Sequence, residues 1–281
     1  MQSVLEVLDK CAAYVSAKGV PNPKFDAQML LARALKCKRL ELFLQFERPM
    51  SDSELSLFRD FARRRAKREP LQHILGEVEF FGLRLKCDRR ALIPRPETEE
   101  MLDNIIKLRL CNSSSPAKIL DLGTGSGAMA LALAKHFPDS SVLAVDASDQ
   151  ALELARENAS VASIRNIEIR KSDWFENIDE SFDLIVANPP YLNEIEISEA
   201  EPEVREFDPI SALLSPDNGM RDLRKILGNA PKHLNCGGFL VCECGLGQAE
   251  KLSVEFSNFY GKIDTAKDLS HVERYIFCQA K

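Results

Sequence analysis

The sequence lacks several features that would place it in other protein classes. None of its apolar runs reaches the roughly 18 residues that a membrane-spanning helix needs. Its amphipathic start, MQSVLEVLDK, carries two acids and differs from a signal peptide. The eight cysteines are scattered, and the close pair Cys242 and Cys244 has no nearby histidine or second cluster to complete a zinc site. These absences predict a cytoplasmic protein with reduced thiols and no metal site.

The chain also lacks the positive charge that is typical of proteins whose main task is to bind phosphate backbones. Its formal net charge is −6, and the sign differs between its parts. Residues 1–75 contain 14 Lys and Arg against 9 Asp and Glu, whereas residues 76–281 have an excess of 11 acids. Much of the basic excess is RRRAKR at 63–68, which we interpret as a solvated helix face, with contact to acidic protein or RNA as the alternative.

The first 75 residues predict a small helical domain. Apolar residues recur there at helical spacing, and SDSE at 51–54 is a capping box that opens a helix through Arg68. Residues 76–92, with EVEFFGLRLKCD, predict a β-hairpin linker whose turn lies near Gly82. A further helix, in PRPETEEMLDNIIKLRL, is expected to begin near Pro96.

Residues 93–281 predict an α/β domain. Short apolar strands alternate there with helices, from AKILDLG to the last strand RYIFCQA. Strands and helices that alternate at this spacing are typical of a parallel, doubly wound sheet. The carboxyl ends of parallel strands meet at one edge of such a sheet, so polar residues that follow each strand are expected to share a crevice there.

The first strand-to-helix turn of this domain is rich in small residues: Gly123, Thr124, Gly125, Ser126 and Gly127. Glycines let backbone N–H groups approach a ligand, and the following helix offers its positive end. The spacing G-x-G-x-G lacks the Lys of a phosphate-binding P-loop and differs from the dinucleotide fingerprint. Asp121, just before the loop, would repel a pyrophosphate and favour a cationic ligand.

Acidic residues also follow the next two predicted strands. Asp146 ends the second strand, where an acid can bind two ribose hydroxyls. Asp173 and Trp174 end the third, where an acid and a ring can bind adenine. Each residue alone could be a satisfied polar group or a core aromatic. Because all three are expected at one crevice, we predict that they bind a ligand together.

The segment DLIVANPPYLN, at 183–193, ends the fourth predicted strand abruptly. Pro189 and Pro190 cannot continue a central strand and hold the backbone extended. Asn188 and the neighbouring carbonyls then form a stiff row of hydrogen-bond acceptors. Such a row predicts a clamp for a ligand that donates hydrogen bonds, and an ordinary turn is the alternative.

Together these motifs resemble the S-adenosylmethionine-dependent methyltransferases, whose motif order matches from about residue 93 to 281. That resemblance implies a Rossmann-like fold that binds S-adenosyl-L-methionine and releases S-adenosyl-L-homocysteine. It implies a cofactor site of Asp121, Gly123 to Gly127, Asp146, Asp173, Trp174 and Asn188. It also implies that Asn188, Pro189, Pro190 and Tyr191 hold a planar NH2 group for methyl transfer.

The segment REPLQHILGEVEFFGLRLKCDRRALIPRPETEEML, at 68–102, resembles the linker of the HemK/PrmC family. Members are N5-glutamine methyltransferases of peptide chain release factors, so the resemblance implies the glutamine of the GGQ loop as substrate and residues 1–75 as a docking domain. The chain departs from the family at His73, where Tyr is frequent, and at Phe207-Asp208-Pro209. Thr98 and Glu99 are candidates for cofactor contact, with a helix cap as the alternative.

Three other functions fit parts of the sequence. A methyltransferase acting on an exocyclic amine of a DNA or RNA base would use the same tetrad on a flipped base, but the acidic domain at 93–281 has no obvious basic insert for phosphates. A non-catalytic binding module would not need both an intact tetrad and an intact glycine loop. A dinucleotide oxidoreductase would need a different loop spacing.

Overall fold

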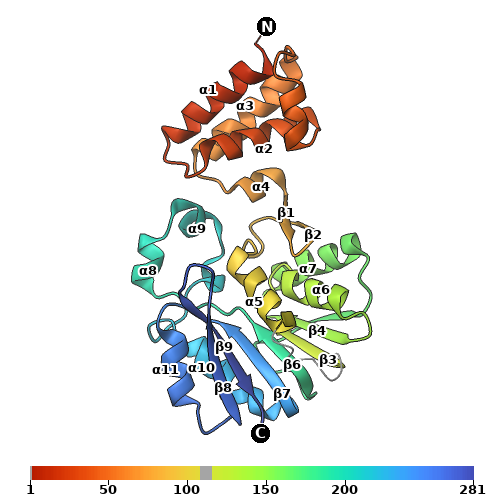
Figure 1. The fold of residues 1–281 in the computed structure, drawn as a ribbon, viewed down its shortest axis with the longest axis vertical. Helices are drawn as coiled ribbons and strands as arrows, with labels where there is room; N and C mark the ends of the chain where they lie inside the picture. Colours follow the sequence, from red (N-terminus) through yellow and green to blue (C-terminus); the bar gives the residue numbers. More distant parts are fainter. Residues whose placement is uncertain (1, 108–115) are drawn as a thin grey trace. The chain divides into compact units, whose positions relative to one another are not determined.

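The structure of the chain, a computed structural model, describes residues 2–107 and 116–281 (Figure 1). It divides into two compact units. The first contains Met1–Glu77 and Glu201–Phe207, and the second contains Val78–Ala200 and Asp208–Lys281. The short segment at 201–207 therefore groups with helices that precede it by more than a hundred residues. Within the described ranges, no helix is long and apolar enough to cross a membrane.

The first unit is helical, as its periodicity predicts. Its elements are α1 (Val4–Ser16), α2 (Pro23–Leu35), a 3-10 helix (Arg39–Leu44), α3 (Asp52–Ala66), α4 (Leu71–Leu75) and α9 (Pro202–Phe207). The capping box at the start of α3 is confirmed, because Ser51 accepts from the Glu54 N–H and Glu54 accepts from the Ser51 N–H. Apolar faces of α1, α2 and α3 pack into one core around Leu8, Leu30 and Phe58.

The basic run at 63–68 is largely an internal ion-pair cluster of the first unit. Arg65 is only 4% exposed; its Nε atom donates to Asp26 at 2.7 Å, and its Nη2 atom lies 2.8 Å from Glu203. Arg68 donates to Glu203 on α9 at 2.7 Å, and Arg64 binds Glu69. The interpretation as a solvated helix face is therefore wrong for Arg65, because a buried guanidinium needs carboxylate partners.

The second unit contains a seven-stranded sheet in the order β5-β4-β3-β6-β7-β9-β8. Its strands are β3 (Lys118–Leu122), β4 (Ser141–Asp146), β5 (Ile167–Lys171), β6 (Phe182–Ala187), β7 (Leu234–Glu243), β8 (Lys262–Lys267) and β9 (Glu273–Gln279). The first five in spatial order are parallel, which confirms the doubly wound fold. The sheet departs from parallel pairing at one edge, where β9 runs antiparallel to both β7 and β8.

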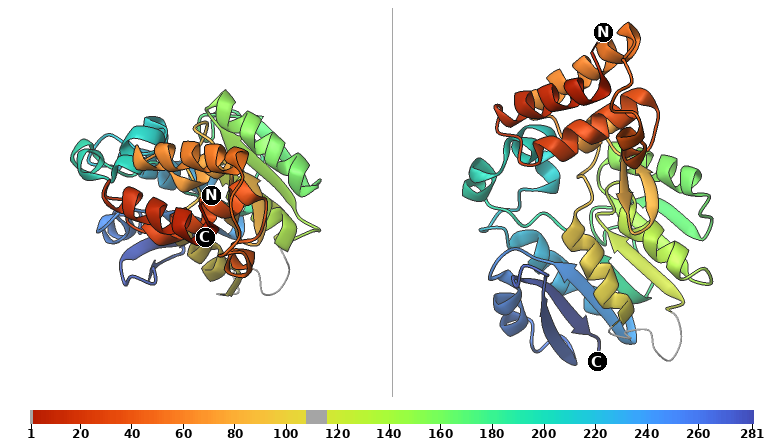
Figure 2. Two further views of the ribbon diagram at one scale, coloured as in Figure 1. Left: turned by 90° about the horizontal axis from the view of Figure 1, so that it is seen from above. Right: turned by 45° about the horizontal axis from the view of Figure 1, so that its top comes forward.

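Helices cover both faces of this sheet. One face carries α5 (Pro96–Lys107), α6 (Ala128–His136), α7 (Asp149–Ala162) and the hairpin of β1 (Glu77–Phe80) and β2 (Leu83–Lys86); the other carries α10 (Arg221–Asn229) and α11 (Gln248–Glu255). Figures 1 and 2 show α5 lying across the sheet. The helix expected from Pro96 is confirmed to Lys107, and its expected residues 108–110 lie outside the described residues.

Alternation along the strands divides the core into two layers. Ile119 and Val142 face α5 and α6, whereas Leu120 and Leu143 face α10 and α11. All four are at most 5% exposed, since parallel strands in this fold are buried on both faces. The chain leaves β3 toward β4 on one side and later returns to β6 on the other. This switch point is where α/β sheets form ligand crevices.

Candidate active site

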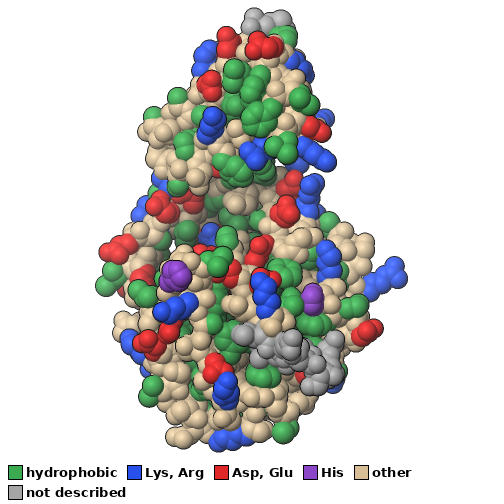
Figure 3. Space-filling view, viewed as in Figure 1, with side chains coloured by type: hydrophobic (Ala, Val, Ile, Leu, Met, Phe, Trp, Pro, Cys, Tyr) green, Lys and Arg blue, Asp and Glu red, His purple; other side chains and the backbone are tan. Residues whose placement is uncertain are grey.

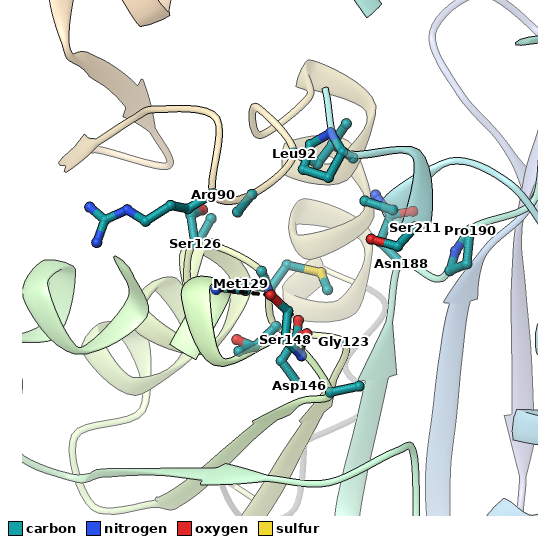
Figure 4. A pocket seen from close by; sticks show the side chains of 18 of the residues that line it. Arg90, Leu92, Gly123, Ser126, Met129, Asp146, Ser148, Asn188, Pro190 and Ser211 are labelled. Atoms are coloured by element: carbon teal, nitrogen blue, oxygen red, sulfur yellow. Dashed lines mark hydrogen bonds between the residues drawn. The ribbon is translucent and has the colours of Figure 1, made fainter. Parts of the chain in front are cut away.

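A cavity of about 620 Å³ lies at the carboxyl edge of the sheet, within the second unit. Nine of the residues that the sequence predicts for the site line it: Gly123, Thr124, Gly125, Ser126, Asp146, Asp173, Trp174, Asn188 and Pro190. Four do not line it: Asp121, Gly127, Pro189 and Tyr191. Figure 4 shows Asn188 and Pro190 on one side of the cavity and Asp146 and Gly123 on another.

The glycines of the loop after β3 have different structural tasks. Gly123 has φ +70°, and a Cβ atom there would lie 3.2 Å from the Trp174 ring. Gly127 has φ +82° at the start of α6, where a Cβ atom would lie 3.2 Å from the Ala155 Cβ atom in α7. Gly123 therefore lets an aromatic ring approach the cavity, whereas Gly127 lets two helices pack closely.

Asp121 organises the loop from beneath. It is fully buried, and its Oδ2 atom accepts from the Thr124 hydroxyl at 2.6 Å and from the Ala130 N–H at 3.1 Å. Its Oδ1 atom accepts no hydrogen bond from any residue that the structure describes. Burial raises the pKa of the Asp121 carboxyl to about 7, against the effect of the two hydrogen bonds. Through these two hydrogen bonds, Asp121 stabilises the conformation of the glycine loop.

Asp146 connects the loop to the end of β4. Its Oδ2 atom accepts from the Gly125 N–H at 2.9 Å, and its Oδ1 atom accepts from the Ser148 N–H at 2.8 Å. Burial raises the pKa of Asp146, and these hydrogen bonds act in the opposite direction. Each carboxylate oxygen keeps a further lone pair, so Asp146 can still accept hydrogen bonds from a ligand in the cavity.

Trp174 and Asp173 form the wall that follows β5. Trp174 has φ +52°, a left-handed conformation that is uncommon for a bulky residue. The Ser172 hydroxyl donates to the Trp174 carbonyl at 2.9 Å and stabilises this turn. The Asp173 Oδ1 atom accepts from the Lys225 ammonium at 2.9 Å. The ring and one carboxylate thus stand together beside the glycine loop.

The predicted tetrad follows β6, and two other elements hold it. The Asn188 Nδ2 atom donates to the Thr98 hydroxyl on α5 at 3.0 Å. Thr98 donates in turn to the Oε2 atom of Glu243 at 2.7 Å, and the Tyr191 hydroxyl donates to its Oε1 atom at 2.9 Å. Glu243, at the end of β7, is 1% exposed. One buried carboxylate therefore links the first and last residues of the tetrad.

Sequence reasoning missed Glu243. Thr98, a candidate for cofactor contact, lines the cavity, and its hydrogen bonds to Asn188 and Glu243 were not foreseen. The signal for Glu243 was an acid in the apolar strand segment CECG, where a charge needs buried partners. Burial raises the pKa of Glu243, and the hydrogen bonds from Thr98 and Tyr191 lower it. Burial and Glu243 raise the pKa of Tyr191, so its hydroxyl remains a donor. Glu99 does not line the cavity and accepts from the Phe81 N–H.

Comparisons with known proteins cover both units. Residues 6–76 match the PrmC N-terminal domain, and residues 101–202 match the methyltransferase small domain. Among solved structures, the T. thermophilus 16S rRNA N2 G1207 methyltransferase in complex with AdoMet and guanosine covers 73% of this chain and 50% of its own, with TM-score 0.53 and 18% identity. At this identity the likeness shows the fold alone, a Rossmann-like methyltransferase fold.

Curated relatives match over almost the whole chain. The release factor glutamine methyltransferase of Geobacter sulfurreducens is 39% identical over 98% of this chain and 95% of its own length. That of Rhodopirellula baltica is 36% identical over 99% of this chain and 96% of its own. The aligned range includes the linker, the glycine loop and the tetrad. The chain therefore belongs to the release factor glutamine methyltransferase family.

Proposed function

We propose that this protein transfers the methyl group of S-adenosyl-L-methionine to the side-chain nitrogen of the glutamine in the GGQ loop of peptide chain release factors. The observation that carries the proposal is the position of Asn188 at the wall of the cavity that Asp146 and the glycine loop also line. Its Nδ2 atom is bound internally, whereas its Oδ1 atom accepts none of the hydrogen bonds among the described residues. That oxygen is available to a carboxamide NH2 group.

The cavity fits the proposed cofactor. Asp146 would accept hydrogen bonds from the ribose hydroxyls with lone pairs that its own loop contacts leave free. Trp174 and Asp173 would bind the adenine, and Gly123 would let the backbone approach the cofactor. When bound, the cofactor supplies an electrophilic methyl group on a positively charged sulfur. The lining contains no Lys-Ser/Thr phosphate-binding motif, which agrees with a ligand without phosphates.

Catalysis would depend on orientation. The nitrogen of a carboxamide is a poor nucleophile because its lone pair is delocalised into the carbonyl. The Asn188 Oδ1 atom would accept a hydrogen bond from one N–H group of the carboxamide. The carbonyl of Pro189, which follows Asn188 but does not itself line the cavity, would accept from the other, and together they would aim the nitrogen at the methyl group. Tyr191 would support this arrangement from outside the cavity wall, through its hydrogen bond to Glu243. Positioning of this kind can contribute several kcal/mol without a covalent intermediate.

Protein docking is the task we propose for the first unit. Several of its apolar side chains are exposed: Tyr14, Phe25, Leu40, Phe43, Leu44 and Leu57. Figure 3 shows hydrophobic side chains gathered on the face of this unit that is turned to the viewer. Exposed apolar side chains suit a protein partner. A release factor as partner would also place the reaction in the cytoplasm.

A nucleic acid base is the weaker candidate substrate. Phosphate contacts require free Lys and Arg side chains. In the basic run, Arg64, Arg65 and Arg68 already have carboxylate partners, which reduces the positive surface that a duplex could use. The acidic excess of residues 76–281 also disfavours binding of a nucleic acid.

The test is incubation of the purified protein with labelled S-adenosyl-L-methionine and one of four acceptors. These are a release factor, its GGQ-to-GGA variant, bulk DNA and bulk RNA. We expect label on the wild-type release factor and on none of the other three. Label on nucleic acid alone would refute the proposed substrate, and label on the GGA variant would refute the proposed acceptor residue.

A further inference from the structure

A hydrogen-bond chain leads from the tetrad, through a residue of the cavity wall, to a buried carboxylate. It runs from the Asn188 Nδ2 atom to Thr98 at 3.0 Å and from Thr98 to Glu243 at 2.7 Å. Thr98 and Glu243 are 4% and 1% exposed. The three residues come from α5, the loop after β6 and the end of β7, so only the folded sheet brings them together.

The direction of this chain is determined by its last member. A carboxylate only accepts hydrogen bonds, and a threonine hydroxyl has a single hydrogen to donate. Because Thr98 donates that hydrogen to Glu243, it can only accept from Asn188. Asn188 must therefore turn its NH2 end toward Thr98 and its carbonyl oxygen away from it. Without the carboxylate, the hydroxyl could donate to the amide oxygen instead, and the amide could turn over.

We propose that Thr98 and Glu243 are positioning residues that determine which end of the Asn188 amide meets the substrate. This inference rests on the proposed function, in which Asn188 accepts from an NH2 group. A turned amide would present two hydrogens to the two hydrogens of the substrate and could not bind it productively. The second oxygen of Glu243 accepts from Tyr191, so the same carboxylate also holds the far end of the tetrad.

The contacts of Glu243 support this acceptor role against the effect of its burial. Burial raises the pKa of Glu243, whereas the hydrogen bonds from Thr98 and Tyr191 and the charge of Arg274 on β9 favour its ionised form. Arg274 is itself held by Asp268, whose Oδ2 atom accepts from the Arg274 Nε atom at 2.8 Å. A glutamine in place of Glu243 would offer one acceptor atom where two hydroxyls now donate, so one of the two contacts would have to reverse or break.

The experiment compares Thr98→Val, which keeps the shape but removes the hydroxyl, with Thr98→Ser, which keeps the hydroxyl. We expect Thr98→Val to lower kcat on the order of 100-fold, the effect that a misplaced reacting group can have. The affinity for S-adenosyl-L-methionine should change by less than about threefold, because the hydrogen bonds affected hold Asn188. Thr98→Ser should restore most of the turnover. Thr265→Val on β8, at the edge of the sheet, is the matched control and should behave as wild type.

A second variant keeps the inference testable if Thr98→Val does not fold. Glu243→Gln should lower kcat to a similar extent, and the double variant with Thr98→Val should be no slower than the worse single variant, because both interrupt one chain. Wild-type turnover in Thr98→Val or Glu243→Gln would overturn the inference. Equal losses in Thr98→Ser and Thr98→Val would also overturn it, since they would point to packing.

An amide NMR signal tests this inference independently of the proposed substrate. The side-chain NH2 signal of Asn188, assigned by its loss in Asn188→Asp, should move in Thr98→Val and stay in place in Thr98→Ser. An unmoved signal would overturn the inference whichever substrate the enzyme uses. If the wild-type protein labels nucleic acid but not the release factor, the proposed function fails, and the same kcat comparison is then made on the labelled substrate.

Discussion

Gly219 supports the tetrad from a loop that lies far from it in the sequence. It has φ +80°, and a Cβ atom at this position would lie 2.0 Å from the Tyr191 carbonyl oxygen and 2.7 Å from the Gln248 Nε2 atom. That same Gln248 atom donates to the Tyr191 carbonyl at 2.9 Å. Gly219→Ala must therefore displace the backbone of Tyr191, because a backbone atom cannot turn aside as a flexible side chain can.

The magnitude follows from three contributions. A left-handed φ costs a non-glycine residue about 1–2 kcal/mol. Overpacking against a buried backbone costs about 1–3 kcal/mol, and loss of the hydrogen bond from Gln248 to Tyr191 costs about 1 kcal/mol. Gly237 provides the matched control, with φ +73° and no atom of the described residues within 4 Å of a Cβ atom. Gly237→Ala should cost the first contribution only, so the two variants should differ by about 2–4 kcal/mol.

Two assays check this prediction. Thermal unfolding should give Gly219→Ala a clearly lower Tm than Gly237→Ala, and methyl transfer should fall in Gly219→Ala alone. The loss should appear in kcat, because the displaced residue belongs to the tetrad and does not line the cavity. Equal Tm values and equal turnover in the two alanine variants would refute the reasoning.

Three further predictions concern the tetrad, the docking unit and a buried acid. Asn188→Ala should keep most of the cofactor affinity measured by titration yet lose on the order of 100-fold in kcat; near-normal turnover would contradict the clamp. Leu44→Asp, at a side chain that is 87% exposed, should change the free energy of unfolding by no more than about 0.5 kcal/mol and should raise the KM for the release factor. An unchanged KM would show that this surface does not dock the release factor. Burial raises the pKa of Asp121 from 3.8 to about 7, so its contribution to stability is present below pH 4 and is lost as the pH rises through 7. In urea unfolding, the stability of wild type relative to Asp121→Asn should fall by up to about 4 kcal/mol between pH 4 and pH 8, and parallel pH curves would contradict this assignment.

The sequence by itself determined the local features. The capping box at 51–54, the turn near Gly82 and the helix from Pro96 follow from short-range chemistry that needs no tertiary contact. The strand-and-helix alternation also determined that the glycine loop, Asp146 and the Asn188 segment would meet, because the carboxyl ends of parallel strands share one edge.

Only the tertiary structure decided the long-range pairings. Asn188 and Thr98 lie 90 residues apart, and Thr98 and Glu243 lie 145 residues apart, so no local pattern joins them. The antiparallel β9 and the grouping of 201–207 with the first unit are likewise not visible in spacing. Arg65 shows the physical reason: its charge suggested a solvated position, but a partner on α2 and another on α9 make its burial possible. Whether a polar side chain faces water or the core depends on partners that folding brings from distant parts of the chain.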